Sequence, residues 1–191
     1  MQEIRLLAVA GSQRVGSFNQ RLLDRAASLA REAGVEVTQI RLSDFPLPLY
    51  TPQAEASGFP EVASELKALF ARHDGFLIAS PEYNGSVSAA LKNALDWVSR
   101  PTGAEEGTAF SAFRGKVAGI MSASPGPFGG IRGLQHLRQI LGTLHTLVVT
   151  EQVVVPFADK AFDGDVLLDG PPAQFLPVLV RRVIQLAPIS A

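Results

Sequence analysis

IRLLAVAGSQRVGSFNQ, residues 4–20, joins a short apolar run to a loop of glycine, serine and polar side chains. Residues 4–10 predict a buried strand, because a continuous apolar run of this length is typical of a parallel sheet. The loop then opens a predicted helix over 18–33, whose apolar residues share one face and which Gly34 ends. A polar glycine loop between a strand and a helix indicates an anion site at the helix N-terminus.

The same alternation continues along the chain. Further strands are expected over 35–40, 75–80, 116–124 and 144–149, with 151–155 as a possible continuation of the last. Helices are expected over 61–72, 87–98, 131–141 and around 173–187. This pattern predicts one α/β domain over 1–191, a doubly wound, five-stranded parallel sheet with helices on both faces, for which 2-1-3-4-5 is one of two suitable strand orders. The glycine-rich loops after the first, third and fourth strands then meet at the carboxyl edge, where ligands bind. They would also lie near the crevice in the more extended dinucleotide-binding order.

Composition narrows the class of protein. The 191 residues are 47% hydrophobic and 18% charged, with a net charge of −1 and no block of like charge. Neither a nucleic acid nor a membrane is therefore expected as a partner. The absence of cysteine excludes disulfides, thiol catalysis and Cys-ligated metals. We read no signal peptide or membrane span and expect a cytoplasmic protein. His73, His136 and His145 lack metal-ligand spacing, so no metal site is expected.

The loop at 11–20 fails two common phosphate motifs. A P-loop needs a lysine where Ser17 stands, and the dinucleotide motif needs a glycine where Gln13 stands. The loop instead offers two hydroxyls, a guanidinium and an amide, from Ser12, Ser17, Arg14 and Asn19. That donor set suits one terminal monophosphate held without a metal. The alternative is that Ser17 only caps the helix while Arg14 is solvated.

SPEYNGS, residues 80–86, follows the third predicted strand. Asn84 and Gly85 mark a tight turn that admits positive φ, and Tyr83 offers a flat aromatic surface. A planar heterocycle lying there would turn its polar edge toward the backbone N–H groups at the start of helix 87–98. The alternative is an ordinary turn between a strand and a helix.

Five stretches together resemble the NADPH-dependent FMN reductase family, which includes flavin, quinone, azo-dye and chromate reductases of flavodoxin-like fold. They are GSQRVGSFN (11–19), PLPLY (46–50), SPEYNGSVSAALKNALDWVSR (80–100), SPGPFGGIRGLQHLRQIL (124–141) and FDGDVLLD (162–169). The resemblance runs over nearly the whole chain in the family's order. One departure follows NGS, where Ser88 and Ala89 replace the family's usual proline and glycine.

The resemblance implies which residues bind FMN in a flavodoxin-like three-layer sandwich. The phosphate and ribityl chain would be held by Ser12, Arg14, Ser17, Phe18 and Asn19. The isoalloxazine ring would be lined by Pro81, Glu82, Tyr83, Asn84, Gly85 and Ser86, and bordered on its other side by Ser122 and by 124–130, including Ser124, Gly126 and Gly129.

The resemblance also implies an activity. The expected function is an NAD(P)H oxidoreductase that passes hydride through FMN to a quinone, free flavin, azo compound or metal oxyanion, with no side-chain acid or base. NADPH or NADH is the expected co-substrate, with Arg132 as a candidate partner for a 2′-phosphate, and a homodimer or homotetramer is expected. One alternative is a flavodoxin-like FMN electron carrier without nicotinamide turnover, against which the net charge of −1 argues. Another is a non-enzymatic sensor or scaffold.

Overall fold

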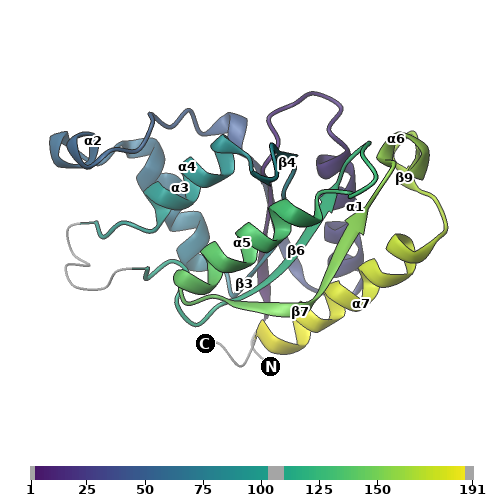
Figure 1. Cartoon of the computed structure of the whole chain (residues 1–191). Helices are drawn as coiled ribbons and strands as arrows, with labels where there is room; N and C mark the ends of the chain where they lie inside the picture. Colours follow the sequence, from purple (N-terminus) through teal and green to yellow (C-terminus); the bar gives the residue numbers. More distant parts are fainter. Residues whose placement is uncertain (1–2, 103–109, 188–191) are drawn as a thin grey trace.

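A five-stranded parallel sheet forms the centre of the computed structural model, which describes residues 3–102 and 110–187 (Figure 1). Its strands are β1 (Arg5–Ala10), β2 (Glu36–Arg41), β3 (Gly75–Ala79), β6 (Val117–Ala123) and β7 (Leu147–Val155). They lie in the order β2-β1-β3-β6-β7, and every neighbouring pair is parallel. The predicted order 2-1-3-4-5 is confirmed.

Helices cover both faces of the sheet, as predicted. One face carries α1 (Phe18–Glu32) and α7 (Pro171–Leu186), and the other carries α3 (Glu61–Arg72), α4 (Ala89–Val98) and α5 (Ile131–Thr143). Successive strand residues point to opposite faces, so Leu6 packs in the first core and Leu7 in the second. Because both faces are buried, the central strands are continuous apolar runs rather than alternating ones.

Short elements fill the connections. They are the 3-10 turn η1 (Leu42–Asp44), α2 (Pro52–Ser57), α6 (Ala158–Ala161), the hairpin of β4 (Glu82–Tyr83) with β5 (Ser86–Val87), and the hairpin of β8 (Phe162–Asp163) with β9 (Val166–Leu167). The helix predicted over 87–98 begins at Ala89, because Val87 pairs with Glu82. The last strand begins at Leu147 rather than residue 144 and is continuous, and α7 begins two residues before the predicted start.

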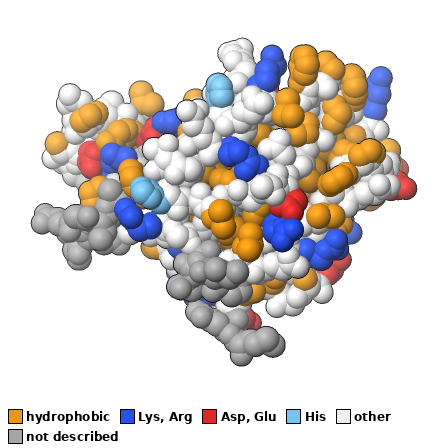
Figure 2. Space-filling model, turned by 60° about the horizontal axis from the view of Figure 1, so that its bottom comes forward, with side chains coloured by type: hydrophobic (Ala, Val, Ile, Leu, Met, Phe, Trp, Pro, Cys, Tyr) orange, Lys and Arg blue, Asp and Glu red, His pale blue; other side chains and the backbone are white. Residues whose placement is uncertain are grey.

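The carboxyl edge of the sheet gathers the predicted functional loops. The loop before α1, the β4–β5 hairpin and the loop before α5 all lie toward the upper edge of the sheet in Figure 1. On the face shown in Figure 2, Lys and Arg side chains are dispersed among uncharged and acidic ones. Over 3–102 and 110–187, no helix is both long and apolar enough to cross a membrane.

Candidate functional site

The N-terminus of α1 presents free hydrogen-bond donors. Ser17 is the N-cap residue, but its side chain makes no capping hydrogen bond, so the first backbone N–H groups of the helix have no side-chain acceptor. Ser12 and Ser17 are buried beside this end, and Gly16 turns the loop with φ of 68°. Arg14 is exposed, and within the described residues its guanidinium has no hydrogen bond or ion pair. Helix dipole, hydroxyls and a free cation thus converge where an anion would sit.

Three loops enclose an open cavity of about 170 Å³ at this point. It is lined by Ser12, Arg14, Gly16, Ser17, Phe18, Asn19, Pro81, Glu82, Tyr83, Ala123, Ser124 and Pro125. The predicted phosphate residues therefore lie together with the first part of the predicted ring loop and with Ser124. Pro125, within the predicted range 124–130, lines the cavity as well. Gly16 and Ala123 were not predicted; each neighbours a predicted residue in sequence, which is the signal that would have found them.

Asn19 links two walls of this cavity. Its Nδ2 donates to the carbonyl of Ala123 at 2.8 Å, and its Oδ1 accepts the N–H of Ala123 at 3.0 Å. Both ends of a buried amide are thus used to hold the first turn of α1 against the end of β6. One N–H of Asn19 remains for a ligand, because an amide nitrogen carries two donors.

The β4–β5 hairpin supports the predicted ring loop. Asn84 and Gly85 form its turn with φ of 52° and 78°, which confirms the positive φ predicted there. Two successive positive φ values are typical of the type I′ turns that join hairpins, and Asn-Gly is their preferred sequence. Asn84, Gly85 and Ser86 do not line the cavity but continue from its wall at Tyr83.

Glu82 faces α5 rather than the turn. Its carboxylate accepts hydrogen bonds from Arg132 Nε at 2.8 Å, from a second Arg132 nitrogen, and from the N–H of Gly133 at 3.0 Å. Burial tends to raise the pKa of Glu82, but these hydrogen bonds outweigh it and hold the pKa below its ordinary value. Arg132, the candidate partner of a 2′-phosphate, is therefore paired with a carboxylate.

The glycine-rich loop after β6 packs closely against its neighbours. Ser122 is fully buried, and in the described part of the chain its hydroxyl has no hydrogen-bond partner. A Cβ at Gly130 would overlap that hydroxyl, and one at Gly129 would overlap Val154. Of the residues predicted for this side, Ser122, Gly126 and Gly129 therefore lie outside the cavity lining, while Ser124 lies within it.

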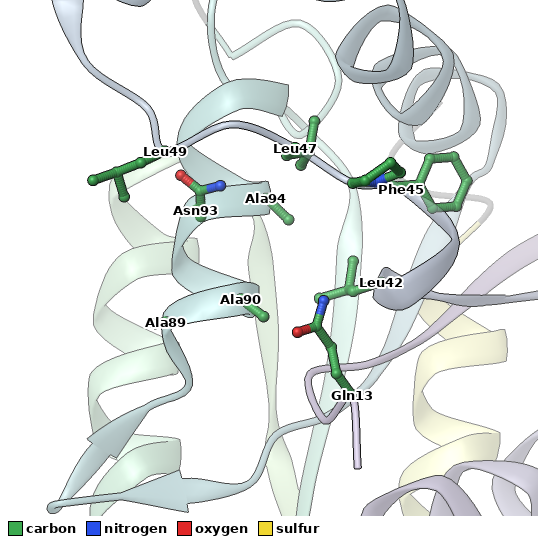
Figure 3. Close-up of a pocket in the computed structure, with 10 residues that line it drawn as sticks. Gln13, Leu42, Phe45, Leu47, Leu49, Ala89, Ala90, Asn93 and Ala94 are labelled. Carbon is green, nitrogen blue, oxygen red and sulfur yellow. The ribbon is translucent and has the colours of Figure 1, made fainter. Parts of the chain in front are cut away.

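A second, largely apolar cavity of about 320 Å³ lies beside the first (Figure 3). Figure 3 shows the amide of Gln13 projecting from the phosphate loop between Leu42 and Ala90 of α4. The wall of the cavity is anchored at Pro48. Its carbonyl accepts hydrogen bonds from Asn93 Nδ2 at 3.0 Å and from the indole N–H of Trp97 at 2.7 Å. Trp97 is fully buried.

The first cavity fits the phosphate end of a flavin nucleotide. It combines an uncapped helix N-terminus, two buried hydroxyls and a free guanidinium, which satisfy a phosphate without a metal. Among the described residues, no group of three His, Asp or Glu side chains could hold a metal ion. The adjacent hairpin adds an exposed aromatic ring, Tyr83, and a turn with positive φ at Asn84 and Gly85.

Comparisons with known proteins point the same way. The model of the NADPH-dependent FMN reductase family matches residues 4–160. An NAD(P)H-dependent FMN reductase of Pseudomonas aeruginosa is 37% identical over 163 residues, which are 85% of this chain and 83% of the relative. An NADPH:quinone oxidoreductase of Arabidopsis thaliana is 43% identical over 72% of this chain and 66% of its own length.

One solved structure supports both the fold and the class of protein. The flavoenzyme FerB, an NAD(P)H:acceptor oxidoreductase from Paracoccus denitrificans, superimposes with a TM-score of 0.79 and 26% identity. The superposition covers 98% of each chain.

Proposed function

The chain belongs to the NADPH-dependent FMN reductase family, and we propose that its first cavity holds FMN and that its acceptor is a quinone. Membership makes it an FMN-dependent NAD(P)H oxidoreductase acting on a small-molecule acceptor. FMN, when bound, supplies the hydride chemistry, and the protein supplies binding, orientation and electrostatics. The observation that carries the placement of FMN is the uncapped N-terminus of α1 beside a free Arg14.

The phosphate is assigned to the start of α1. Ser12 and Ser17 offer hydroxyls, Arg14 offers charge, and the N–H groups of Phe18 and Asn19 offer donors aligned with the helix dipole. A charge-assisted hydrogen bond to a phosphate contributes roughly 1.5–3 kcal/mol, so Arg14 should be the largest single contributor. Asn19 has the further task of fixing the helix to β6 through Ala123.

The ring is assigned to the surface of the hairpin and its approach. Pro81 and Tyr83 would provide apolar contact, and backbone N–H groups of the Asn84–Gly85 turn would serve the pyrimidine edge. Fixed donors at such an edge stabilise negative charge as it develops, as in an oxyanion hole. The segment 80–91 contains no Lys, Arg or His, so backbone N–H groups and the N-terminus of α4 must provide this stabilisation.

A quinone is the proposed acceptor class. The relatives named above include one described as an NADPH:quinone oxidoreductase. The loops that form the first cavity carry exposed apolar side chains: Val15 is 97% exposed, Phe128 59% and Tyr83 51%. An exposed apolar rim favours a flat, weakly polar acceptor over a charged one.

The decisive experiment is anaerobic mixing of the FMN-loaded protein with NADPH or NADH, followed by a quinone. We expect bleaching of the flavin absorbance by the nucleotide and its recovery on addition of the quinone, with steady turnover in ping-pong kinetics. An electron carrier of flavodoxin type would bind FMN but show no bleaching by either nucleotide. A protein that binds no FMN would leave only the sensor or scaffold hypothesis.

Two further predictions are retained as proposals. We propose a single domain over 1–191, because α1, α3, α4, α5 and α7 all pack on one shared sheet.

We also propose a homodimer or homotetramer with the flavin near the subunit junction. On the outer face of α4, Lys92 and Asp96 pair with each other at 2.7 Å. Their charges are thereby offset, which lowers the cost of covering this face with a second subunit.

A further inference from the structure

The β4–β5 hairpin has only two residues in each strand. A hairpin of this size is not stable by itself in water, so its orientation must be set by whatever it packs against. The described contacts show that its support is the first half of α5.

Glu82 provides the first attachment. One carboxylate oxygen accepts hydrogen bonds from two nitrogens of Arg132. The other accepts a hydrogen bond from the N–H of Gly133 at 3.0 Å. Gly133 lies in the first turn of α5, where the backbone N–H groups have no partner within the helix. The Glu82 side chain is only 7% exposed, whereas that of Arg132 is 56% exposed. Glu82 therefore acts as an acceptor for the helix N-terminus, supplied from a residue about fifty positions earlier in the chain.

The second strand of the hairpin is attached as well. Ser86 Oγ lies 2.9 Å from His136 Nδ1, one turn further along α5. A Cβ on Gly133 would lie 3.2 Å from the carbonyl oxygen of Ser86 and 3.3 Å from Cβ of Glu82. The backbones thus approach closely enough that a side chain at 133 would press on both strands. The hairpin is held on both sides of its turn.

We propose that Glu82 is a positioning residue that fixes the Asn84–Gly85 turn in the orientation its N–H groups need toward the isoalloxazine ring. This inference rests on the proposed placement of the ring over the hairpin. Arg132 offsets the charge of Glu82, so a carboxylate close to the ring does not oppose negative charge there. The resemblance assigns Glu82 to the lining of the ring; its carboxylate instead faces α5.

The test uses the full chain loaded with FMN and two variants. Glu82→Ala removes the attachment, whereas Glu82→Gln keeps the shape of the side chain and one acceptor oxygen, which can accept from Arg132 or from Gly133 but not from both. Hydrogen exchange of segment 81–87 reports the order of the hairpin, and the flavin midpoint potential reports the donors. For Glu82→Ala we expect exchange about ten times faster or more, as for loss of a charged hydrogen bond, and a lower potential. Glu82→Gln should recover part of the slow exchange, because one of the two contacts remains.

Glu151→Ala is the matched control. Glu151 also forms an ion pair with an arginine, Arg182, at 2.9 Å, but it lies on β7, outside the lining of the first cavity. This variant should leave the exchange of 81–87 and the flavin potential unchanged. If Glu82→Ala does not fold, Arg132→Met, which keeps the bond to Gly133, should show faster exchange of 81–87 at reduced size; only exchange is compared for this variant, because loss of Arg132 also leaves the charge of Glu82 without its partner.

Three outcomes would overturn the inference. The first is unchanged exchange in Glu82→Ala. The second is faster exchange with an unchanged potential, which would show that the turn does not address the ring. The third is a higher potential, which would show that Glu82 acts through its charge. Failure of the proposed function is seen separately, because the wild-type chain would then bind no FMN. In that case, hydrogen exchange of 81–87 in the FMN-free proteins still tests whether Glu82 attaches the hairpin to α5.

Discussion

The hydroxyl of Ser88 donates a hydrogen bond to the carbonyl of Gly11 at 2.5 Å, and the same oxygen accepts the N–H of Leu91 at 3.2 Å. One buried side chain thereby joins the start of the phosphate loop to the N-terminus of α4. The backbone of the phosphate loop lies close to α4 and to Pro81, since a Cβ on Gly11 would lie 3.0 Å from the side chain of Leu91 and 3.3 Å from that of Pro81. The two loops that form the proposed FMN site are therefore mechanically connected at the position where the family usually has proline.

Replacing Ser88 should test this connection. Ser88→Ala is expected to weaken FMN binding about 2- to 10-fold and to lower the free energy of unfolding by about 1 kcal/mol, because it removes a hydrogen bond and a helix cap. Ser88→Pro should weaken FMN similarly without backbone strain, since φ of Ser88 is −65°. Titration of FMN fluorescence measures the affinities, and urea unfolding measures the free energy of unfolding. Ser64→Ala, on the surface of α3, is the control, and equal affinity in all four proteins would contradict the prediction.

Arg14→Ala should weaken FMN binding about 10- to 100-fold, because it removes a charge-assisted contact to the phosphate. Riboflavin, which has no phosphate, should bind the wild type and the variant equally well. Arg25→Ala removes another cation of the same region, one that pairs with Glu32 at 3.0 Å, and should change neither affinity. If wild-type protein binds riboflavin as tightly as FMN, the phosphate does not lie at the start of α1.

Light scattering should give a mass two or four times the chain mass of 20.3 kDa at micromolar concentration. The physical reason is that α4 presents a face of paired charges beside an open, apolar cavity, and exposed apolar surface favours association. A mass of about 20 kDa under these conditions would contradict the proposed assembly.

Lys116 should make stability depend on pH in the alkaline range. Its ammonium group donates to the carbonyls of Phe70 and Ala71 at the end of α3, and burial lowers the pKa of Lys116 from 10.5 to about 8. Between these values the unfolded chain binds more protons than the folded chain, so the free energy of unfolding rises with pH, by at most about 3 kcal/mol. Urea unfolding from pH 8 to 10.5 measures the slope.

Lys116→Met should remove this dependence on pH, while Lys160→Met, at an exposed position on α6, should retain it. A variant at Lys116 with the wild-type slope would show that another group titrates in this range.

The sequence predicts the elements with strong local signals. The helix predicted over 61–72 has the bounds of α3, because its apolar spacing and flanking residues are both clear. The positive φ at Asn84 and Gly85 was likewise predictable, since the Asn-Gly pair favours one kind of turn. The alternation of strands and helices predicted the parallel sheet, and the resemblance to a family of flavodoxin-like fold favoured the strand order that the structure has.

The contacts that organise the site could not be predicted in this way. Asn19 binds Ala123 over 104 positions, and Glu82 binds Arg132 over 50. No local pattern marks such pairs, because a glutamate before a turn looks the same whether it faces a ligand or a helix N-terminus. The start of α4 was misplaced for a related reason: Val87 is apolar and suits the helix face, but its backbone is used by the hairpin.

Gly85→Val should lower the flavin midpoint potential, and it tests mechanism rather than binding alone. A Cβ at Gly85 would meet no atom within 4 Å, so the substitution acts through φ of +78°, which a β-branched residue resists. The turn must then relax, and its N–H groups lose their direction toward the ring. Negative charge at the pyrimidine edge is present chiefly after reduction, so the reduced state loses more stabilisation than the oxidised one.

The size of the effect can be bounded. Loss of one donor to a developing charge costs about 2.7–4 kcal/mol in a closed site, and less where water can enter. A loss of about 1–2.7 kcal/mol corresponds to a fall of about 20–60 mV for a two-electron couple. Tyr83→Ala is the comparison, because it removes apolar contact from a half-exposed ring and should weaken FMN in both redox states evenly. An unchanged potential in fully loaded Gly85→Val would mean that the hairpin does not tune the flavin.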